Sequence, residues 1–388
     1  MVGRCYSGSL RRDGRTVKSA LDRVASRAVY VCEWAFLLGR AIFRGLTHRH
    51  NTECFMMLKK SLTGLLWFLF SLPLHAYAFG AQPDHAVPPE APATDPLSVP
   101  DAGLGNPLVF VVYGDMRFTD PSETVAAVPG PRRALVTKVA SEHPDALFLT
   151  GDVPWHGGDP ADYRVFDQET TLWREQHLRL YPVLGNHEFS GCKEADCLEN
   201  WWQAFPDFRG RRWYAVSLGT KVRAFALDSD TSLLPGSEQR QWLEREIDTL
   251  PADVRFVVVM LHHPPVADQG FLIVRSNERA LARYLKSIAA RSPARFIVCS
   301  GHVHNYERFE RDRVVYLVSG GGGAKPFVVF RGRADQYREH GFPNFHYIRF
   351  ELQGEHLTAE MVRLEDYNEP SPHMWATKDR FELWAKAR

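Results

Sequence analysis

Five short stretches of this chain carry side chains that could bind metal ions, and each follows a run of apolar residues. The apolar runs LVFVVY, ALFLT, YPVL, FVVVML and FIVCS have the length and composition of buried strands. In an open α/β sheet, the loops at the carboxyl ends of the strands converge on one crevice. Carboxylate, amide and imidazole groups gathered there would suit divalent metal ions. The five stretches are Gly114-Asp115, Gly151-Asp152, Gly185-Asn186-His187-Glu188, His262-His263-Pro264 and Gly301-His302-Val303-His304.

The order of these motifs, GD, GD, GNHE, HHPP and GHVH, resembles that of the calcineurin-like metallophosphoesterases, a superfamily related to the purple acid phosphatases. The resemblance spans residues 107–364, and GNHE and GHVH are its specific elements. It implies an α/β (α+β mixed) fold in which two packed mixed β-sheets are flanked by helices in a four-layer sandwich. It also implies a hydrolase that acts on phosphoric ester bonds.

The resemblance further implies a site with two divalent or transition metal ions, of Fe, Mn or Zn. Asp152 would bridge the ions, with Asp115 and His304 on the first. A hydroxide bound to the ions would attack the phosphate ester. The second ion would be held by Asn186, His262 and His302.

Two histidines beside the expected ligands would face the substrate. His187 would be the catalytic residue that protonates the leaving oxygen or stabilises its charge. His263 would line the substrate pocket, although the sequence leaves open which member of the His262-His263 pair binds metal.

The chain departs from the family pattern in its first motif. Many members have Asp-x-His there, whereas this chain reads Asp115-Met116-Arg117. Purple acid phosphatases instead have a Tyr three residues after the second Asp, where this chain has Trp155. Since neither Arg nor Trp ligates a metal, either water completes the first site, His156 substitutes, or the site is weak. Arg117 could bind a phosphate oxygen of the substrate or form a surface salt bridge.

Four functions are compatible with these residues. A phosphomonoesterase is favoured, and a phosphodiesterase or a nucleotide or pyrophosphate hydrolase is the alternative for a catalytic protein. A protein that binds phosphate ligands without catalysis, through a degenerate first metal site, is the alternative from another class. His187 favours catalysis, because a binding protein has no need of a group that protonates the leaving oxygen.

The N-terminal region has the pattern of a secretory signal peptide over residues 56–78. Lys59 and Lys60 precede the apolar run LTGLLWFLFSLPL, which is short for a membrane span, and Ala76-Tyr77-Ala78 suits cleavage. We therefore expect a periplasmic or secreted protein without a stable membrane anchor. Residues 1–55 would be untranslated or form a disordered basic arm, and residues 79–106, rich in Pro and Ala, would be a flexible leader.

Charge does not favour nucleic acid as a partner. The chain of 388 residues has 47 basic and 46 acidic residues, of which twelve basic and four acidic ones precede residue 79. The remaining 35 basic and 42 acidic residues give a net charge of about −7. A mildly acidic body without a basic run does not attract the nucleic-acid backbone. The family resemblance instead implies a small phosphate ester or another phosphorylated substrate.

Two cysteines in the loop after GNHE are spaced for a small disulfide. Cys192 and Cys197 could pair in an oxidising compartment, and a metal pair is the rival interpretation.

The resemblance implies a phosphoesterase domain over residues 107–364, which leaves a C-terminal tail over residues 365–388. A period typical of helices occurs at residues 132–142, 168–178, 238–250 and 277–291. The last third alternates by two, in VVYLVSG, FVVF, FHYIRFEL and LTAEMVRL, which predicts antiparallel strands.

Overall fold

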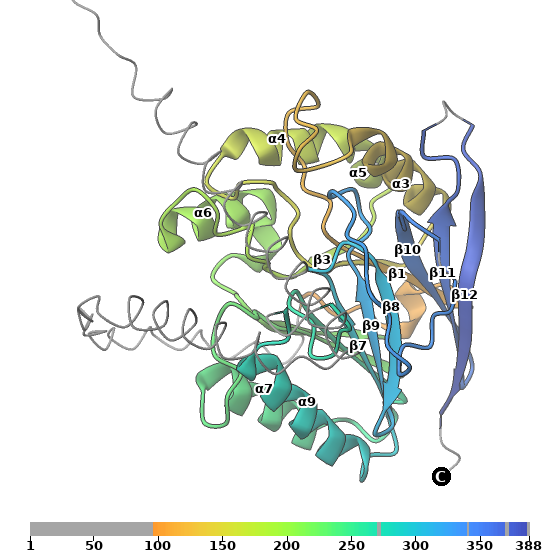
Figure 1. The fold of residues 1–388 in the computed structure, drawn as a ribbon. Helices are drawn as coiled ribbons and strands as arrows, with labels where there is room; N and C mark the ends of the chain where they lie inside the picture. The colour runs from red at the N-terminus through yellow and green to blue at the C-terminus, as the bar shows by residue number, and fades with distance from the viewer. Residues whose placement is uncertain (1–95, 270–272, 340, 369–371, 386–388) are drawn as a thin grey trace, which may run out of the picture. The chain divides into compact units, whose positions relative to one another are not determined.

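The computed structural model describes residues 96–269, 273–339, 341–368 and 372–385. The expected signal peptide and the stretch before it lie outside these residues. The described chain forms two six-stranded β-sheets with helices on their outer faces (Figure 1). The predicted fold, two packed mixed sheets flanked by helices, is confirmed.

The first sheet has the strand order β12-β11-β10-β1-β2-β3. Its β1, β2 and β3 are parallel, while β10, β11 and β12 add antiparallel pairs beside β1. Parallel neighbours need a crossover, which α3 (Pro129–Ser141) provides between β1 and β2. The strands are β1 (Leu108–Tyr113), β2 (Ala146–Leu149), β3 (Leu180–Pro182), β10 (His346–Gln353), β11 (His356–Leu364) and β12 (Trp375–Trp384).

The second sheet has the order β4-β5-β6-β7-β9-β8. Its centre, β5, β6, β7 and β9, is parallel, and β4 and β8 are antiparallel edge strands. The strands are β4 (Tyr214–Leu218), β5 (Val222–Ala226), β6 (Phe256–Leu261), β7 (Arg295–Ser300), β8 (Tyr306–Arg311) and β9 (Val314–Ser319).

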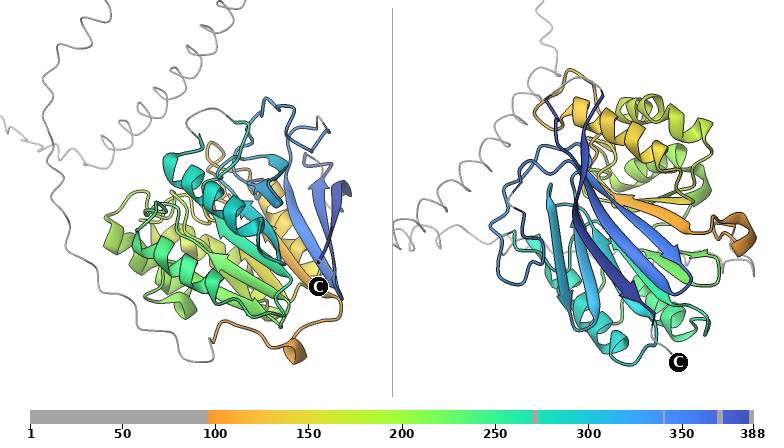
Figure 2. Two further views of the ribbon diagram at one scale, coloured as in Figure 1. Left: turned by 90° about the horizontal axis from the view of Figure 1, so that it is seen from below. Right: turned by 90° about the vertical axis from the view of Figure 1, so that its right-hand side faces the viewer.

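The helices form the two outer layers. In Figure 1, α3 to α6 lie on one side of the sheets and α7 and α9 on the other, and Figure 2 shows the same layers from two further directions. The residues at the start of α4 explain why a helix begins there. Pro160 occupies the first turn, and the Asp159 side chain caps it by accepting a hydrogen bond from Ala161 N at 2.9 Å. The remaining helices are α4 (Pro160–Glu169), α5 (Thr171–Glu175), α6 (Glu194–Ala204), α7 (Glu238–Asp248), α9 (Ser276–Ala289) and the 3₁₀ turns η1 (Asp101–Gly103) and η2 (Pro206–Phe208).

Strand β6 shows how both faces of a central strand are buried. Val258 and Met260 belong to the same hydrophobic core as β1 and β2 of the first sheet. Val257 and Val259 belong to a second core with the apolar faces of α7 and α9. Because successive side chains point to opposite faces, a strand packed on both sides is apolar throughout, as FVVVML is.

Both ends of the domain extend beyond the range expected from sequence. Residues 96–106 were assigned to a flexible leader, but Leu97 and Val99 are buried and Val99 N donates to Ser217 O at 2.8 Å. The tail expected from residue 365 is also wrong, because β12 pairs with β11 along its length. In each segment only a few apolar side chains pack against the domain. They are too few to give the sequence a clear helix or strand periodicity.

Three helix and strand predictions need correction. The helix expected at 168–178 is two helices, α4 and α5, and α6 was not predicted. The segment FVVF (327–330) is a loop rather than a strand, and Val328 and Phe330 are exposed. Within the described residues, no helix is long and apolar enough to cross a membrane.

Candidate metal centre

The expected site residues come together where strands of both sheets end. Asp115 follows β1 and Asp152 follows β2, whereas His262 follows β6 and His302 follows β7. A backbone hydrogen bond joins the loops after β1 and β2, because Asp115 N donates to Gly151 O at 3.0 Å. Across the sheets, His302 N donates to the Asp115 carboxylate at 2.9 Å.

Backbone strain is concentrated in these loops. Asp115, Arg117, Asp152 and His302 have φ angles of 60°, 49°, 53° and 69°, in the left-handed region that residues with a side chain rarely adopt. Each such residue costs on the order of 1–3 kcal/mol and persists only where its surroundings hold it. Four strained residues in one crevice therefore mark it as a functional site.

Potential metal-ligand atoms of His262, Asp152, Asn186 and His302 form one group, in which neighbouring nitrogen and oxygen atoms are in contact. The Nε2 atom of His262 lies 3.2 Å from Asp152 Oδ1 and 3.1 Å from Asn186 Oδ1. Asn186 Oδ1 is in turn 3.1 Å from Nδ1 of His302. The other ring nitrogen of His262, Nδ1, donates to Thr150 O at 2.9 Å, so that Nε2 carries the lone pair in the neutral ring.

A second group of atoms surrounds Asp115. His304 Nδ1 donates to Lys325 O at 2.6 Å, and this fixes a lone pair on Nε2. That Nε2 is buried without a hydrogen-bond partner and lies 3.5 Å from Asp115 Oδ1. A buried acceptor without a partner, aimed at a carboxylate, fits a cation between the two.

The pKa values of the acidic and imidazole groups in the site also favour the binding of cations. Burial, followed by the neighbouring Asp152, raises the pKa of Asp115 well above its usual range. Burial alone would raise the pKa of Asp152 too, but His262, His187 and Arg117 hold it well below the usual range. Burial lowers the pKa of His302 to about 3, so its ring is neutral at pH 7, the form that binds a metal.

The residues present therefore fit divalent metal ions. Asp152, Asn186, His262 and His302 could hold one ion, and Asp115, His304 and the second oxygen of Asp152 another. Mixed nitrogen and oxygen donors of this kind suit borderline ions such as Zn, Fe or Mn.

Glu188 is a site residue that sequence reasoning missed. It is fully buried, and its Oε2 accepts hydrogen bonds from Asp152 N at 3.0 Å and Gly185 N at 2.8 Å. Its Oε1 accepts from Val153 N at 2.8 Å. One carboxylate thus holds the Asp152 loop and the Asn186 loop together. Its place at the end of GNHE was the only signal in the sequence.

Arg117 and Trp155 occupy the positions where family members have a further ligand. The Arg117 guanidinium lies 3.3 Å from Asp152 Oδ2 and 4.9 Å from the centre of the Trp155 ring. The surface salt-bridge interpretation of Arg117 is wrong, because its partner is a fully buried carboxylate in the site. His156 does not substitute as a ligand: its Nδ1 lies 3.8 Å from Asp162 Oδ2 and its side chain is 43% exposed.

His187 lies at the edge of the acceptor group. Its ring stacks on Trp155 at 4.5 Å, and its Nδ1 donates to Trp155 O at 2.7 Å. This leaves Nε2 facing the site, 3.8 Å from Asp152 Oδ2. Burial lowers the pKa of His187 to about 4.

His263 lies behind His302 rather than beside Asn186. Its ring centre is 4.3 Å from that of His302, and its Nδ1 lies 2.8 Å from the Ser229 hydroxyl oxygen. Of the two adjacent histidines, His262 is the one that contacts the Asp152 and Asn186 side chains.

The glycine run after β9 lets the two sheets approach. A Cβ on Gly320 would lie 2.8 Å from Asp115 Oδ2, and one on Gly322 would lie 2.3 Å from Gly114 O. The run is therefore a point of close backbone contact behind the site.

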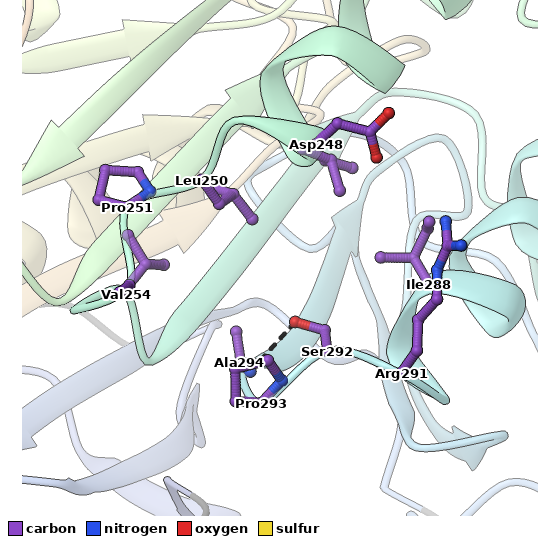
Figure 3. A pocket seen from close by; sticks show the side chains of 11 residues that line it. Asp248, Leu250, Pro251, Val254, Ile288, Arg291, Ser292, Pro293 and Ala294 are labelled. Atoms are coloured by element: carbon purple, nitrogen blue, oxygen red, sulfur yellow. Dashed lines mark hydrogen bonds between the residues drawn. The ribbon is translucent and has the colours of Figure 1, made fainter. Parts of the chain in front are cut away.

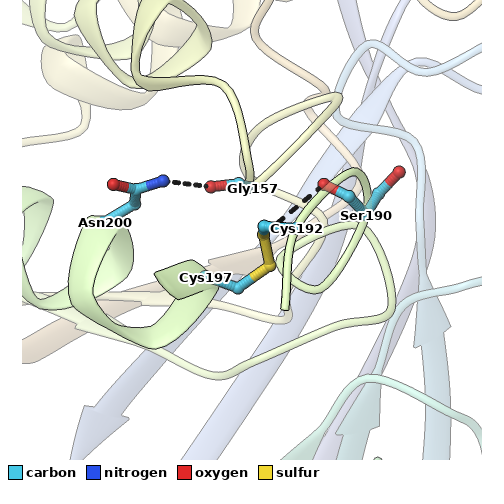
Figure 4. Close-up of a disulfide and its surroundings, with 5 residues drawn as sticks. All are labelled: Gly157, Ser190, Cys192, Cys197 and Asn200. Carbon is cyan, nitrogen blue, oxygen red and sulfur yellow. Dashed lines mark hydrogen bonds between the residues drawn. A yellow bond between two sulfur atoms is a disulfide. The ribbon is translucent and has the colours of Figure 1, made fainter. Parts of the chain in front are cut away.

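Cys192 and Cys197 form a disulfide in the structure, with their Cα atoms 5.7 Å apart. Figure 4 shows it joining the loop after GNHE to the start of α6. In the same region, Asn200 Nδ2 donates to Gly157 O at 2.9 Å, which ties α6 to the loop after Asp152.

A cavity of about 280 Å³ lies far from this chemistry (Figure 3). It is formed by the ends of α7 and α9 and the segments that lead into β6 and β7, at the opposite edge of the sheet from His262 and His302. Its lining includes Ile247, Leu250, Pro251, Val254 and Ile288. This cavity offers no group of potential metal ligands, and we assign it no part in the site.

The fold and the converging potential metal ligands agree with comparison to known proteins. The family model of the calcineurin-like phosphoesterases matches residues 105–306. The chain belongs to this family. No curated protein matches its sequence.

Solved structures share the fold at low identity. The purple acid phosphatase PPD1 from yellow lupin (Lupinus luteus) seeds superposes with a TM-score of 0.58 and 17% identity. The match covers 74% of this chain and 55% of the lupin chain, so the chain spans about half of that protein. GAP50, described as the anchor in the inner membrane complex of Plasmodium, superposes with a TM-score of 0.50 and 13% identity, covering 73% of this chain and 90% of that one.

Proposed function

We propose that this protein is an exported, metal-dependent phosphoesterase with a dinuclear site, and that it acts first of all on phosphomonoesters. The observation that carries the proposal is the convergence of acceptor atoms from Asp152, Asn186, His262 and His302, in which neighbouring atoms lie 3.1–3.3 Å apart. Acceptors crowd in this way only where a cation, or a shared proton, offsets their repulsion.

In this proposal the two ions supply Lewis acidity to the phosphoryl oxygens and lower the pKa of water in the site. The chain's own residues do the rest. Ligand atoms of Asp115, Asp152 and His262 lie within 4.8 Å of one another, so Asp152 is the residue that could contribute to both metal positions. Thr150 and Lys325 orient His262 and His304 through their carbonyl oxygens.

His187 and Arg117 are the groups left to contact the substrate. The Nε2 atom of His187 is free of the backbone bond that Nδ1 makes, and in the neutral ring it carries the lone pair. To act as the acid, this Nε2 must first take up a proton, which the negative charge of a bound phosphate ester would favour. Arg117 is 13% exposed and keeps Nε without a hydrogen-bond partner. Its guanidinium can therefore turn a donor towards a phosphate oxygen, and a monoester dianion gains most from this contact.

The test combines metal analysis with turnover. Protein purified without chelator should contain between one and two transition metal ions per chain, and Asp152→Asn should lose them. After reconstitution with Mn, Zn or Fe, the wild type should cleave 4-nitrophenyl phosphate faster than bis(4-nitrophenyl) phosphate. The reverse order would favour a phosphodiesterase, and cleavage of pyrophosphate or a nucleotide alone would favour that alternative.

Arg117→Ala separates the two substrate classes further. It should slow monoester cleavage much more than diester cleavage, because only the monoester has a second negative charge for the guanidinium. Equal kinetics for wild type and Arg117→Ala on the monoester would remove Arg117 from the substrate site.

A non-catalytic binding protein is the second candidate, and Arg117 is the observation that favours it. Its positive charge, 3.3 Å from Asp152 Oδ2, opposes a cation at the first site. The fold also occurs in GAP50, which is described as an anchor. A full load of metal without turnover of any of the esters would support this candidate and overturn the catalytic one.

Export is the part of the proposal that rests on sequence alone. The mature protein should begin at or near Phe79 and be recovered from the periplasm or medium. Sequencing its terminus checks this, and a protein with intact Met1 in the cytoplasm would contradict it. The disulfide between Cys192 and Cys197 is compatible with an oxidising compartment.

A further inference from the structure

Three carboxylates outside the candidate metal centre form a second cluster, and none of them belongs to the five sequence motifs. Asp268 lies in the loop after β6, Glu307 lies on β8, and Asp335 lies in the loop between β9 and β10. Each offers one oxygen, and the three oxygens lie within 4.8 Å of one another. Like charges held so close, away from bulk water, need a partner of opposite charge.

Arg331 supplies such a partner to Asp335, but one oxygen of Glu307 has none. Glu307 is fully buried, and its Oε1 accepts a hydrogen bond from Asp268 N at 2.8 Å. Its Oε2 is buried without any hydrogen-bond partner. A buried carboxylate oxygen loses its hydration on folding, so one that gains no donor in return points to a ligand.

Backbone groups hold the other oxygens of the cluster in place. Asp335 Oδ1 accepts from Arg308 N at 3.1 Å and from Tyr337 N at 3.0 Å. Asp268 Oδ2 accepts from Gly332 N at 2.6 Å. Several separate segments therefore fix the carboxylates before any ligand arrives, which is how protein cation sites are preorganised.

The charge of the cluster matches a divalent cation. Arg331 pairs with Asp335 and also donates from Nη2 to Asn305 Oδ1 at 3.1 Å. With all three carboxylates ionised, as they would be around a cation, they and this guanidinium carry a net charge of −2. Burial, followed by Asp335 and Asp268, raises the pKa of Glu307 to about 8, so without a cation this carboxyl group is largely protonated at pH 7.

We propose that Asp268, Glu307 and Asp335 form a binding site for one Ca²⁺ ion, separate from the candidate metal centre. The donors are all oxygens, a set that favours a hard cation over Zn²⁺ or Cu²⁺. Ca²⁺ tolerates the irregular geometry of three carboxylates completed by water better than Mg²⁺ does. Asp268 is only half-buried, so the ion can enter and keep water ligands on that side.

The ion stabilises a wall of the candidate metal centre. The loop that carries Asp335 begins near Lys325, whose carbonyl orients His304. In the same loop, Phe327 N donates to His304 O at 3.0 Å, and the Phe327 ring stacks on the His304 ring at 4.1 Å. Binding Ca²⁺ to Asp335 and Asp268 fastens this loop to β8 and to the segment after His263.

The proposal is tested on the full mature chain carrying Asp152→Asn, which disables the candidate metal centre as a source of Ca²⁺ binding. After treatment with EDTA, adding CaCl₂ should raise the Tm with saturation, by roughly 5 °C at about 100 times the Kd. Isothermal titration should give one Ca²⁺ per chain. Adding Glu307→Gln should abolish both effects, whereas adding Glu175→Gln, at an exposed position, should change neither.

Glu307→Gln is a fair test because Gln keeps the shape of Glu and its oxygen can still accept from Asp268 N. If this variant does not fold, Asp268→Asn, at the half-buried rim, replaces it. Two results would overturn the proposal: a Ca²⁺-dependent rise in Tm that survives both substitutions, or no rise in the protein with Glu307 intact. In the second case, a higher Tm for Glu307→Gln in EDTA would show that Glu307 is a buried neutral acid.

Discussion

The guanidinium of Arg117 lies 3.3 Å from Oδ2 of Asp152, the carboxylate at the centre of the candidate metal site. Trp155 supports it from the side, with its ring centre 4.9 Å from Arg117 Cζ. The two residues that depart from the family pattern are thus in contact, and together they bring a fixed positive charge to the position of a missing ligand. In the proposed dinuclear site, we therefore expect the first ion to bind more weakly than the second.

Restoring a ligand should strengthen that site. Arg117→His removes the positive charge and adds an imidazole near Asp115 and Asp152, so the affinity for the first ion should rise by roughly tenfold or more, since each 1.4 kcal/mol of relieved repulsion is a factor of ten. Competition with a chromogenic chelator measures this. Arg133→His, a change at an exposed arginine, is the control. An Arg117→His protein with the metal content and affinity of the wild type would show that Arg117 does not occupy a ligand position.

His187→Ala should affect the leaving group rather than the metals. The imidazole is held by Trp155 O and by stacking, so its removal should leave the metal content nearly unchanged. Turnover of esters with poor leaving groups, such as alkyl phosphates, should fall by about 10²-fold or more, the usual effect of losing a general acid. The fall should be much smaller for 2,4-dinitrophenyl phosphate, which needs no proton.

Steady-state kinetics over a series of leaving groups provides the measurement, with His156→Ala as a control at the neighbouring exposed imidazole. If His187→Ala slowed all esters equally, His187 would be a positioning residue rather than an acid.

The expected ligand residues of the site were easier to predict from sequence than the residues that hold them in place. Asp115, Asp152, His262 and His302 were placed correctly because each ends an apolar run, and strand ends in such sheets meet at one edge. Glu188 was missed because its partners are backbone N–H groups up to 36 residues away, and nothing in the sequence indicates such a contact. The cluster around Glu307 was missed for the same reason.

The helices and strands also differ in how well the sequence predicted them. The helices α7 and α9 have long amphipathic patterns and were predicted to within a few residues. The strand β12 was not predicted, because it is an edge strand whose half-buried and exposed residues follow no clear alternation. The helix α6 starts between the two bonded cysteines, where its polar first turn looked like loop.

Glu188→Gln should destabilise the fold and the metal site together. All three backbone bonds to Glu188 need an acceptor, and Gln places an NH₂ group against at least one N–H. Leaving a buried donor unpaired costs about 1–3 kcal/mol of unfolding free energy, which urea denaturation measures. Because the loops of Asp152 and Asn186 then move, metal affinity should fall as well. Glu175→Gln, at an exposed residue, should change neither, and unchanged stability in Glu188→Gln would mean that the clamp is not needed.

The buried His346 should make the fold sensitive to acid. Burial lowers its pKa to about 4, and its neutral ring is satisfied by Asn344 O at 2.9 Å from Nδ1 and by the Ser319 hydroxyl at 3.1 Å from Nε2. A Cβ on Gly321 would lie 2.2 Å from Nδ1, so backbone packs directly on the ring and excludes water.

A histidine with a depressed pKa contributes stability that is present above its unfolded pKa of about 6.5 and is lost as the pH falls towards its folded pKa. Between pH 7 and pH 4, the advantage of the wild type over His346→Gln in unfolding free energy should therefore shrink by up to roughly 3 kcal/mol. Urea denaturation at several pH values measures this difference. The exposed His177→Gln serves as the control and should show a constant difference across the range. A constant difference for His346→Gln as well would mean that His346 takes up its proton in the folded protein as readily as in the unfolded chain.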